Sequence, residues 1–246
     1  MRKGVTASQN IQTLKWLTAA GMEVKWNFLY GFPGEDPGAY ADLPSLVAKL
    51  VHLAPPQADG RVRIDRFSPY FESPEASGLS PPRPIRAYRH VFPFGGEGLA
   101  SLAYYFAVEG PQSTTEDTQP SGAPGYVQPA LAALENWREL AGTVTLRGHD
   151  HPEGLLILFD TRPVARSFEY RLRGWARTLY CYCDTARRLP QIIQRIKEED
   201  GSVDEPEIRR KLNEWIDACI MVCIDGAYLS LALVLDRACR ISHASR

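Results

Sequence analysis

The sequence predicts an α/β protein in two parts: a parallel sheet with helical crossovers, then a smaller α+β module. Three observations lead to this fold class. Helical and strand patterns alternate over the first hundred residues, as in parallel strands that are joined by helices. Residues 109–125 are almost without apolar side chains, which is typical of a linker or mobile loop. Strand patterns, three helical patterns and an apolar hairpin follow that stretch.

The first elements are a helix and a strand. Thr6 and Gln9 form a capping-box pattern at the helix start, and the helix is expected to stop at Gly21. Residues 26–30 are an apolar run that predicts a buried strand. The apolar face of the helix consists of Ile11, Leu14 and Leu17.

A turn and a second helix come next. Gly31-Phe32-Pro33-Gly34 predicts a tight turn. Asp36 offers an N-cap, and Pro37 offers the first helical position. Apolar residues then recur at helical spacing, at Tyr40, Leu43, Val47, Leu50 and Val51.

Three more elements complete the predicted order up to the second module. Residues 62–66 alternate as a strand, and the apolar residues among positions 99–106 predict a helix before the linker. After the linker, another helix is expected to stop at Gly142, with Leu131, Leu134 and Trp137 on its apolar face.

The second module reads as strands, three helices and a terminal hairpin. Its strands are predicted around residues 144–146, at 155–159 and at 168–172. Asp225-Gly226, between two apolar runs, is a strong signal for a two-residue hairpin. This order of elements is winged-helix-like, and we expect the hairpin to pack on the helix that carries Ile208, Leu212 and Trp215.

Three short motifs, in order, resemble a known family. They are Met1-Arg2-Lys3-Gly4, Gly31-Phe32-Pro33-Gly34-Glu35 and Arg66-Phe67-Ser68-Pro69-Tyr70. The chain resembles the later part of radical SAM enzymes, most closely the cobalamin-binding type that matures ribosomal peptides as C-methyltransferases. The resemblance continues more loosely to about residue 235. It implies the C-terminal part of a partial (β/α) barrel over residues 1–108 and a helix plus a winged-helix-like domain over 126–246.

The resemblance also implies where cofactors and substrate would lie. Residues at the C-terminal ends of the barrel strands line the S-adenosylmethionine pocket in this family, in line with the general rule for barrels. Carried over by position, the cofactor-binding residues would be Asn27, Tyr30, Gly31, Arg66 and Ser68. The alternative is that Gly31 only forms a turn and that Arg66 only pairs with a carboxylate. Glu35 is interpreted as part of the turn rather than as a catalytic acid.

The cysteines depart from the family pattern. The family binds a four-iron cluster through Cys-x3-Cys-x2-Cys, and none of the five cysteines here form that spacing. We therefore expect the four-iron cluster and the cobalamin in a missing or separate N-terminal half, and this chain alone to be inactive. Buried apolar thiols are a better interpretation than metal ligands.

Composition restricts the partners. The net charge is −1 and no apolar run approaches a bilayer span, so neither nucleic acid nor a membrane is predicted. The odd cysteine count and the absence of a signal-peptide pattern predict a cytoplasmic protein. His149-Asp150-His151 is interpreted as a polar turn between strands, not as a metal site.

The winged-helix-like module leaves open what it does. DNA binding fits poorly, because the helix over residues 204–217 is net acidic. Recognition of a ribosomal precursor peptide, added as a strand to the edge at residues 168–172, and simple packing against the barrel are equally consistent with the sequence. The arginines near that edge are Arg171, Arg173, Arg187 and Arg188. Peptide C-methylation by a complete enzyme is thus one expected function, and a stand-alone peptide-binding module is the alternative.

Overall fold

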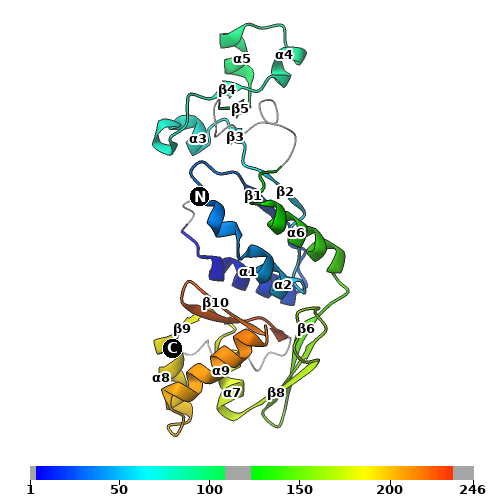
Figure 1. Cartoon of the computed structure of the whole chain (residues 1–246), viewed down its shortest axis with the longest axis vertical. Coiled ribbons are helices and arrows are strands. Elements are labelled where there is room, and N and C mark those ends of the chain that lie inside the picture. Colours follow the sequence, from blue (N-terminus) through cyan, green and yellow to red (C-terminus); the bar gives the residue numbers. More distant parts are fainter. Residues whose placement is uncertain (1–3, 109–122, 235–246) are drawn as a thin grey trace. The chain divides into compact units, whose positions relative to one another are not determined.

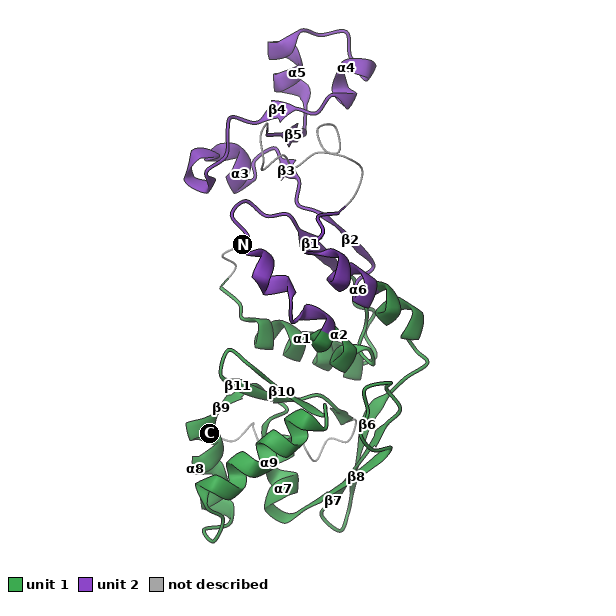
Figure 2. Ribbon diagram, viewed as in Figure 1, with its two compact units in different colours: residues 1–25, 45–55, 135–246 green, residues 26–44, 56–134 purple. Residues whose placement is uncertain are grey.

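The computed structural model describes residues 4–108 and 123–234 (Figure 1). Most of the predicted linker at 109–125 therefore lies outside the described residues. The chain forms two compact units, each built from several chain segments (Figure 2). Unit 1 comprises residues 1–25, 45–55 and 135–246, and unit 2 comprises residues 26–44 and 56–134. This division does not follow the predicted boundaries, because the first helix and residues 45–55 group with the C-terminal half of the chain.

Unit 2 contains a parallel strand pair and a small antiparallel sheet. Strand β1 (Asn27–Tyr30) pairs in parallel with β2 (Ala58–Arg61). The antiparallel sheet has the order β3-β5-β4. Its strands are β3 (Ile64–Asp65), β4 (Arg83–Pro84) and β5 (Tyr105–Ala107). The short helices of unit 2 are η1 (Pro37–Tyr40), α3 (Pro69–Glu72), η2 (Glu75–Ser77), α4 (Ala87–Val91) and α5 (Gly96–Leu102).

Two helices run across the boundary between the units. They are α2 (Leu43–Leu50) and α6 (Gln128–Leu140). The predicted helix around Leu131, Leu134 and Trp137 corresponds to α6. The predicted N-cap at Asp36 is confirmed, since its carboxylate accepts from the Gly38 N–H, but the helix that it begins is the short 3₁₀ turn η1.

Unit 1 contains two sheets and four complete helices among its described residues. The four-stranded sheet has the order β12-β6-β7-β8, and the three-stranded sheet has the order β10-β11-β9. The strands of the larger sheet are β6 (Leu146–His151), β7 (Leu155–Asp160), β8 (Glu169–Arg173) and β12 (Leu233–Val234). Those of the smaller sheet are β9 (Arg187–Arg188), β10 (Met221–Ile224) and β11 (Ala227–Ser230).

Four helices contribute apolar side chains to the core of unit 1. They are α1 (Ala7–Ala19), α7 (Gly174–Tyr182), α8 (Leu189–Glu199) and α9 (Glu205–Asp217). The predicted capping box at Thr6 and Gln9 is present. Tyr180 and Trp215 meet edge to face, 5.2 Å between ring centroids, and both are buried. The helical spacing of apolar residues thus gives each of the three predicted helices, α7, α8 and α9, a buried face.

The predicted hairpin is confirmed. Strands β10 and β11 pair antiparallel across Asp225 and Gly226, and the backbone φ angles of these two residues are +54° and +71°. Two positive φ angles are the signature of the type I′ turn. Strand β10 packs against α9, as expected.

None of the described sheets closes into a barrel, and the partial barrel stays a prediction. Two expectations about strands are wrong. Strand β1 is not fully buried, because it has a single neighbour, β2, and Leu29 is 40% exposed while Tyr30 is buried. The strand predicted at residues 62–66 is broken: the Val62 N–H donates to the Tyr30 carbonyl, 2.7 Å, and the chain then starts β3.

Two further local expectations need correction. His149-Asp150-His151 is no turn but the end of β6, where these residues pair with residues 155–157 of β7. Phe106 lies in β5 rather than in a helix. Among the cysteines, Cys183 and Cys219 are buried free thiols, but Cys223 is exposed and Cys181 is disulfide-bonded.

No helix in the described part of the chain has the length and apolar run that a bilayer crossing requires.

Candidate functional site

The turn after β1 is organised around one carboxylate. Glu35 accepts hydrogen bonds from the backbone N–H groups of Gly31 and Phe32, both at 2.8 Å, and from the Tyr40 hydroxyl at 2.8 Å. The Tyr126 hydroxyl also donates to this carboxylate, at Oε1, the oxygen that accepts from Gly31. Gly31 has φ +77°, a left-handed angle that favours glycine. Glu35 therefore holds the turn closed, in the structural role that the sequence suggested.

The hydrogen bonds around Glu35 also set its protonation. Burial acts to raise the pKa of Glu35, but the four donors outweigh it, so that the pKa lies below its ordinary value. Burial, together with the hydrogen bond to Glu35, raises the pKa of the Tyr126 hydroxyl to about 12 and also raises the pKa of Tyr40. Both hydroxyls therefore stay protonated and act as donors at neutral pH.

Three predicted cofactor residues lie together on this strand and turn. Asn27 is exposed at the start of β1, Tyr30 is buried at its end, and Gly31 follows directly. A side chain at Gly31 would meet the Arg61 side chain at 3.3 Å. The Gly31 N–H is already bound to Glu35, so it is not free for a ligand in this conformation.

The other two predicted cofactor residues have structural partners elsewhere in unit 2. Arg66 donates from Nε to the Ala103 carbonyl, 2.7 Å, and from Nη2 to the Ala100 carbonyl. Its guanidinium also lies over the rings of Phe71 and Phe106. Ser68 is the N-cap of α3 and its hydroxyl accepts from the Phe71 N–H, 3.3 Å. The polar atoms of Arg66 and Ser68 thus have structural partners in the packing of α3 and β5, and their role towards a cofactor stays a prediction.

A second candidate site is the outer edge of β8. Within residues 4–108 and 123–234, this strand is the last in its sheet and has β7 as its one neighbour. The Asp160 N–H donates to the Phe168 carbonyl, 2.9 Å, which fixes which residues face β7. Backbone groups in an antiparallel pair alternate between the two sides. Those of Phe168, Tyr170 and Leu172 therefore point to β7, and those of Glu169, Arg171 and Arg173 point outward.

One serine closes part of this edge. Ser167 Oγ accepts from the Glu169 N–H, 3.3 Å, and donates to the Glu169 carbonyl, 2.9 Å. The backbone groups of Glu169 are therefore satisfied. Among the described residues, no hydrogen bond engages the outward N–H and C=O of Arg171 or the N–H of Arg173. Sequence reasoning missed Ser167, although a serine two residues before a strand position is a known local partner for backbone groups.

The side chains at this edge are basic and aromatic. Arg171 and Arg173 are exposed, and Arg171 makes an ion pair with Glu169. Phe168 is 63% exposed and lies against Phe159, 5.8 Å between ring centroids. The two other arginines that the sequence placed near this edge, Arg187 and Arg188, lie instead in β9 of the smaller sheet.

The segment His149-Asp150-His151 also makes a structural contact, through Asp150. Asp150, between His149 and His151, accepts from Arg177 Nε at 2.8 Å and from Nη2 at 2.5 Å. This bidentate pair ties β6 to α7 and raises the pKa of Arg177. Within the described residues, no group of three or more His, Cys, Asp or Glu side chains could hold a metal ion.

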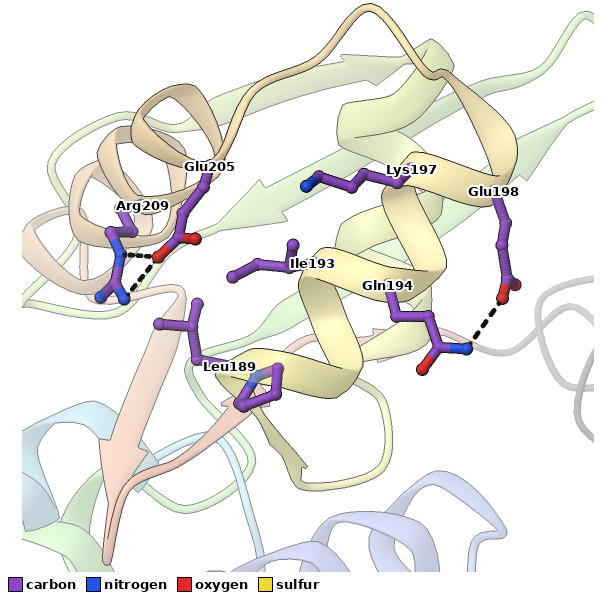
Figure 3. A pocket seen from close by; sticks show the side chains of 8 residues that line it. Leu189, Ile193, Gln194, Lys197, Glu198, Glu205 and Arg209 are labelled. Atoms are coloured by element: carbon purple, nitrogen blue, oxygen red, sulfur yellow. Dashed lines mark hydrogen bonds and ion pairs between the residues drawn. The ribbon is translucent and has the colours of Figure 1, made fainter.

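A cleft of about 630 Å³ lies between α8 and α9. Figure 3 shows Leu189 and Ile193 of α8 facing Glu205 and Arg209 of α9, with Lys197 reaching across from the end of α8. Glu205 and Arg209 bind each other, with 2.8 Å between Oε1 and Nε. Gln194 and Glu198 are likewise bound to each other, on the outer side of α8. The cleft is therefore lined by the apolar side chains of Leu189 and Ile193. Four of its polar lining residues are bound to one another in two pairs.

Comparisons with protein-family models, with curated proteins and with solved structures found no match for this chain.

Proposed function

We propose that this chain binds an extended peptide, which adds as a strand to the free edge of β8. The observation that carries the proposal is that, among the described residues, β8 is an edge strand on which the outward N–H and C=O of Arg171 and the N–H of Arg173 have no bond. Strand addition uses such groups for affinity and the neighbouring side chains for specificity. The exposed ring of Phe168 offers an apolar contact beside the same edge.

The topology around this edge also favours a peptide over DNA. The order α7-β9-α8-α9-β10-β11, with the sheet order β10-β11-β9, is in keeping with a winged helix, and we propose that class for this part of unit 1. In DNA-binding members the third helix, here α9, presents cations to phosphates. The cations of α9 are instead paired within the helix, Arg209 with Glu205 and Lys211 with Glu214.

Proline substitution at residue 171 tests the edge directly. The Arg171 N–H faces outward, so Arg171→Pro removes a donor to the peptide without removing a bond to β7. Candidate precursor peptides, labelled with a fluorophore, should bind the unchanged chain and lose at least tenfold in affinity with Arg171→Pro. Arg171→Ala keeps the N–H and serves as the control. Equal affinities of the Pro and Ala variants, with unchanged thermal unfolding, would rule out strand addition at this edge.

A wider proposal concerns the reaction. The Gly31–Glu35 turn and the parallel β1–β2 pair are in keeping with a strand and turn of a radical SAM barrel. In this proposal the chain is the C-terminal portion of an enzyme that matures ribosomal peptides, by C-methylation. S-Adenosylmethionine, a four-iron cluster and cobalamin would supply the chemistry. Asn27, Tyr30, Gly31, Arg66 and Ser68 remain the proposed cofactor contacts, and no step is assigned to residues of this chain. A stand-alone peptide-binding module is the alternative.

Iron–sulfur reconstitution tests whether this chain binds a four-iron cluster by itself. The chain should bind no stoichiometric four-iron cluster by itself, because its cysteines do not have the Cys-x3-Cys-x2-Cys spacing. Absorbance near the cluster band and iron counting after reconstitution measure this. A full cluster in the chain alone would contradict the assignment of cluster binding to another segment.

A further inference from the structure

From the side chains at the edge of β8 we infer the chemical class of the peptide: an extended segment with two acidic residues at alternate positions. The inference rests on the proposed strand addition at this edge and concerns its specificity. Arg171 and Arg173 lie two residues apart in β8, so that their side chains are on the same face of the sheet. The residues opposite them in an added strand would also be two apart, whether that strand runs parallel or antiparallel.

The position of the pairing is fixed by Ser167. Because Ser167 Oγ satisfies both backbone groups of Glu169, an added strand gains no bond by extending to that residue. Pairing is therefore confined to Arg171 and Arg173, where the N–H and C=O of Arg171 and the N–H of Arg173 have no bond among the described residues. The peptide therefore places no residue opposite Glu169, where a basic residue would have been favoured.

The charges on this face favour carboxylates. The pairing of Arg147 with Phe159, and of Phe159 with Glu169, places Arg147 on the same face as Arg171 and Arg173. All three arginines are exposed, and Glu169 is the one acidic residue that β6, β7 and β8 put on that face. Directly opposed unlike charges stabilise neighbouring strands, and like charges destabilise them. A carboxylate opposite each arginine therefore fits this surface.

The residue between the two acidic positions faces the other side of the sheet. On that side its neighbours in β8 are Tyr170, which is half-buried, and Leu172, which is buried. A β-branched apolar residue matches such neighbours. The preferred core of the peptide is thus acidic, apolar, acidic.

Three synthetic peptides test the inference. They share the sequence Thr-Val-X-Val-X-Val-Thr and carry Glu, Gln or Lys at both X positions. Binding to the full chain is followed by fluorescence anisotropy, and amide hydrogen exchange locates the bound peptide. We expect the Glu peptide to bind about tenfold more tightly than the Gln peptide, and the Lys peptide to bind more weakly still. The preference should shrink as salt is raised, since these charges are exposed.

Matched charge variants show whether the two arginines cause the preference. Arg171→Gln with Arg173→Gln should abolish it, whereas Lys197→Gln with Arg210→Gln, which removes two exposed charges from α8 and α9, should leave it unchanged. Arg171→Glu with Arg173→Glu should reverse it in favour of the Lys peptide, a gain that misfolding cannot produce.

The outcomes separate this inference from the proposed function. If the three peptides all slow exchange at the amides of residues 171 and 173 with equal affinity, or if the Lys peptide binds best, strand addition stands and the acidic preference is wrong. If none of the peptides slows exchange at these amides, both the strand addition and the acidic preference fail.

Discussion

At the scale of single residues, unit 1 buries several polar side chains, and two basic residues among them have several partners each. Lys15 is 1% exposed, and its ammonium donates to the carbonyls of Ser230, 2.7 Å, and Asp184, 3.0 Å, and pairs with the Asp184 carboxylate at 2.8 Å. Arg162 and Asp160 form a fully buried ion pair at 2.6 Å, and Arg162 also donates to the Cys219 carbonyl. Removing one partner of such a pair leaves an uncompensated charge, which is strongly destabilising.

His52 is the buried polar residue whose charge depends on pH. Its Nε2 lies 2.9 Å from the Leu231 carbonyl, and Nδ1 has no partner among the described residues. Burial, together with the positive charge of Arg162, lowers the pKa of His52 to about 3. The neutral ring, protonated at Nε2, therefore donates to Leu231 in the folded state.

Acid should destabilise the protein through His52. An unfolded histidine titrates near pH 6.5, whereas the folded one resists protonation down to about pH 3. The unfolded state thus binds the extra proton as pH falls from 6.5 towards 3, and the free energy of unfolding drops by up to about 1.4 kcal/mol per pH unit. Above pH 6.5 this contribution is constant. In urea unfolding, His52→Leu should show a shallower loss between pH 6.5 and 4.5, and parallel curves for the two proteins would contradict the prediction.

At the scale of elements, the hairpin β10–β11 closes the small sheet of unit 1. Tyr228 and Ala227 of β11 pair with Arg187 and Arg188 of β9, so the hairpin joins the start of α8 to the end of α9. The turn residues decide whether the hairpin forms in this register, because both have positive φ. An added side chain at Gly226 meets no backbone, so that strain there comes from the backbone angle itself.

Gly226→Val should lower the free energy of unfolding by about 1–3 kcal/mol through that strain. Gly201→Val is the matched control, since Gly201 lies in a turn of the same unit without a positive φ. Thermal unfolding of the full chain measures both. Equal midpoints for the two variants would mean that the strained turn contributes little to the folded core.

Local elements were predictable where a few neighbouring residues determine them. The capping box at Thr6, the N-cap at Asp36 and the Asp225-Gly226 turn depend on hydrogen bonds or φ angles within four residues. The polar composition of residues 149–151 resembles a turn, and only their pairing with β7 makes them a strand. The role of Arg66 was hidden for a similar reason, because its acceptors lie 34 and 37 residues away.

At the scale of the whole molecule, the candidate edge at β8 was predictable but its closure by Ser167 was not. An apolar–polar alternation at 168–172 indicates a strand, and the last strand before a helix is often at an edge. The grouping of α1 with the C-terminal half has no signal in the sequence. The contacts that join α1 to this half include those of Lys15, whose partners lie 169 and 215 residues away.

The same grouping predicts how a fragment behaves. Residues 126–246 were expected to form a domain, but within unit 1 helix α1 packs against β10, β11 and β12. A fragment of residues 126–246 should therefore unfold at a lower temperature than unit 1 in the full chain and bind more of a hydrophobic dye. Addition of a peptide of residues 4–25 should raise its midpoint. A fragment as stable as the full chain would show that α1 contributes no stability.

The long separation between Lys15 and Ser230 also affects the protein while it is being made. Ribosomes add about 5–20 residues per second, so Lys15 of α1 is synthesised roughly 10–40 seconds before its partner carbonyl at Ser230, 215 residues later. Unit 2, which ends at Leu134, is complete well before that moment. During this interval the apolar face of α1, with Ile11, has none of its final neighbours on β10, β11 and β12. Newly made chains should therefore expose this face of α1 until the strands β10, β11 and β12 have been synthesised.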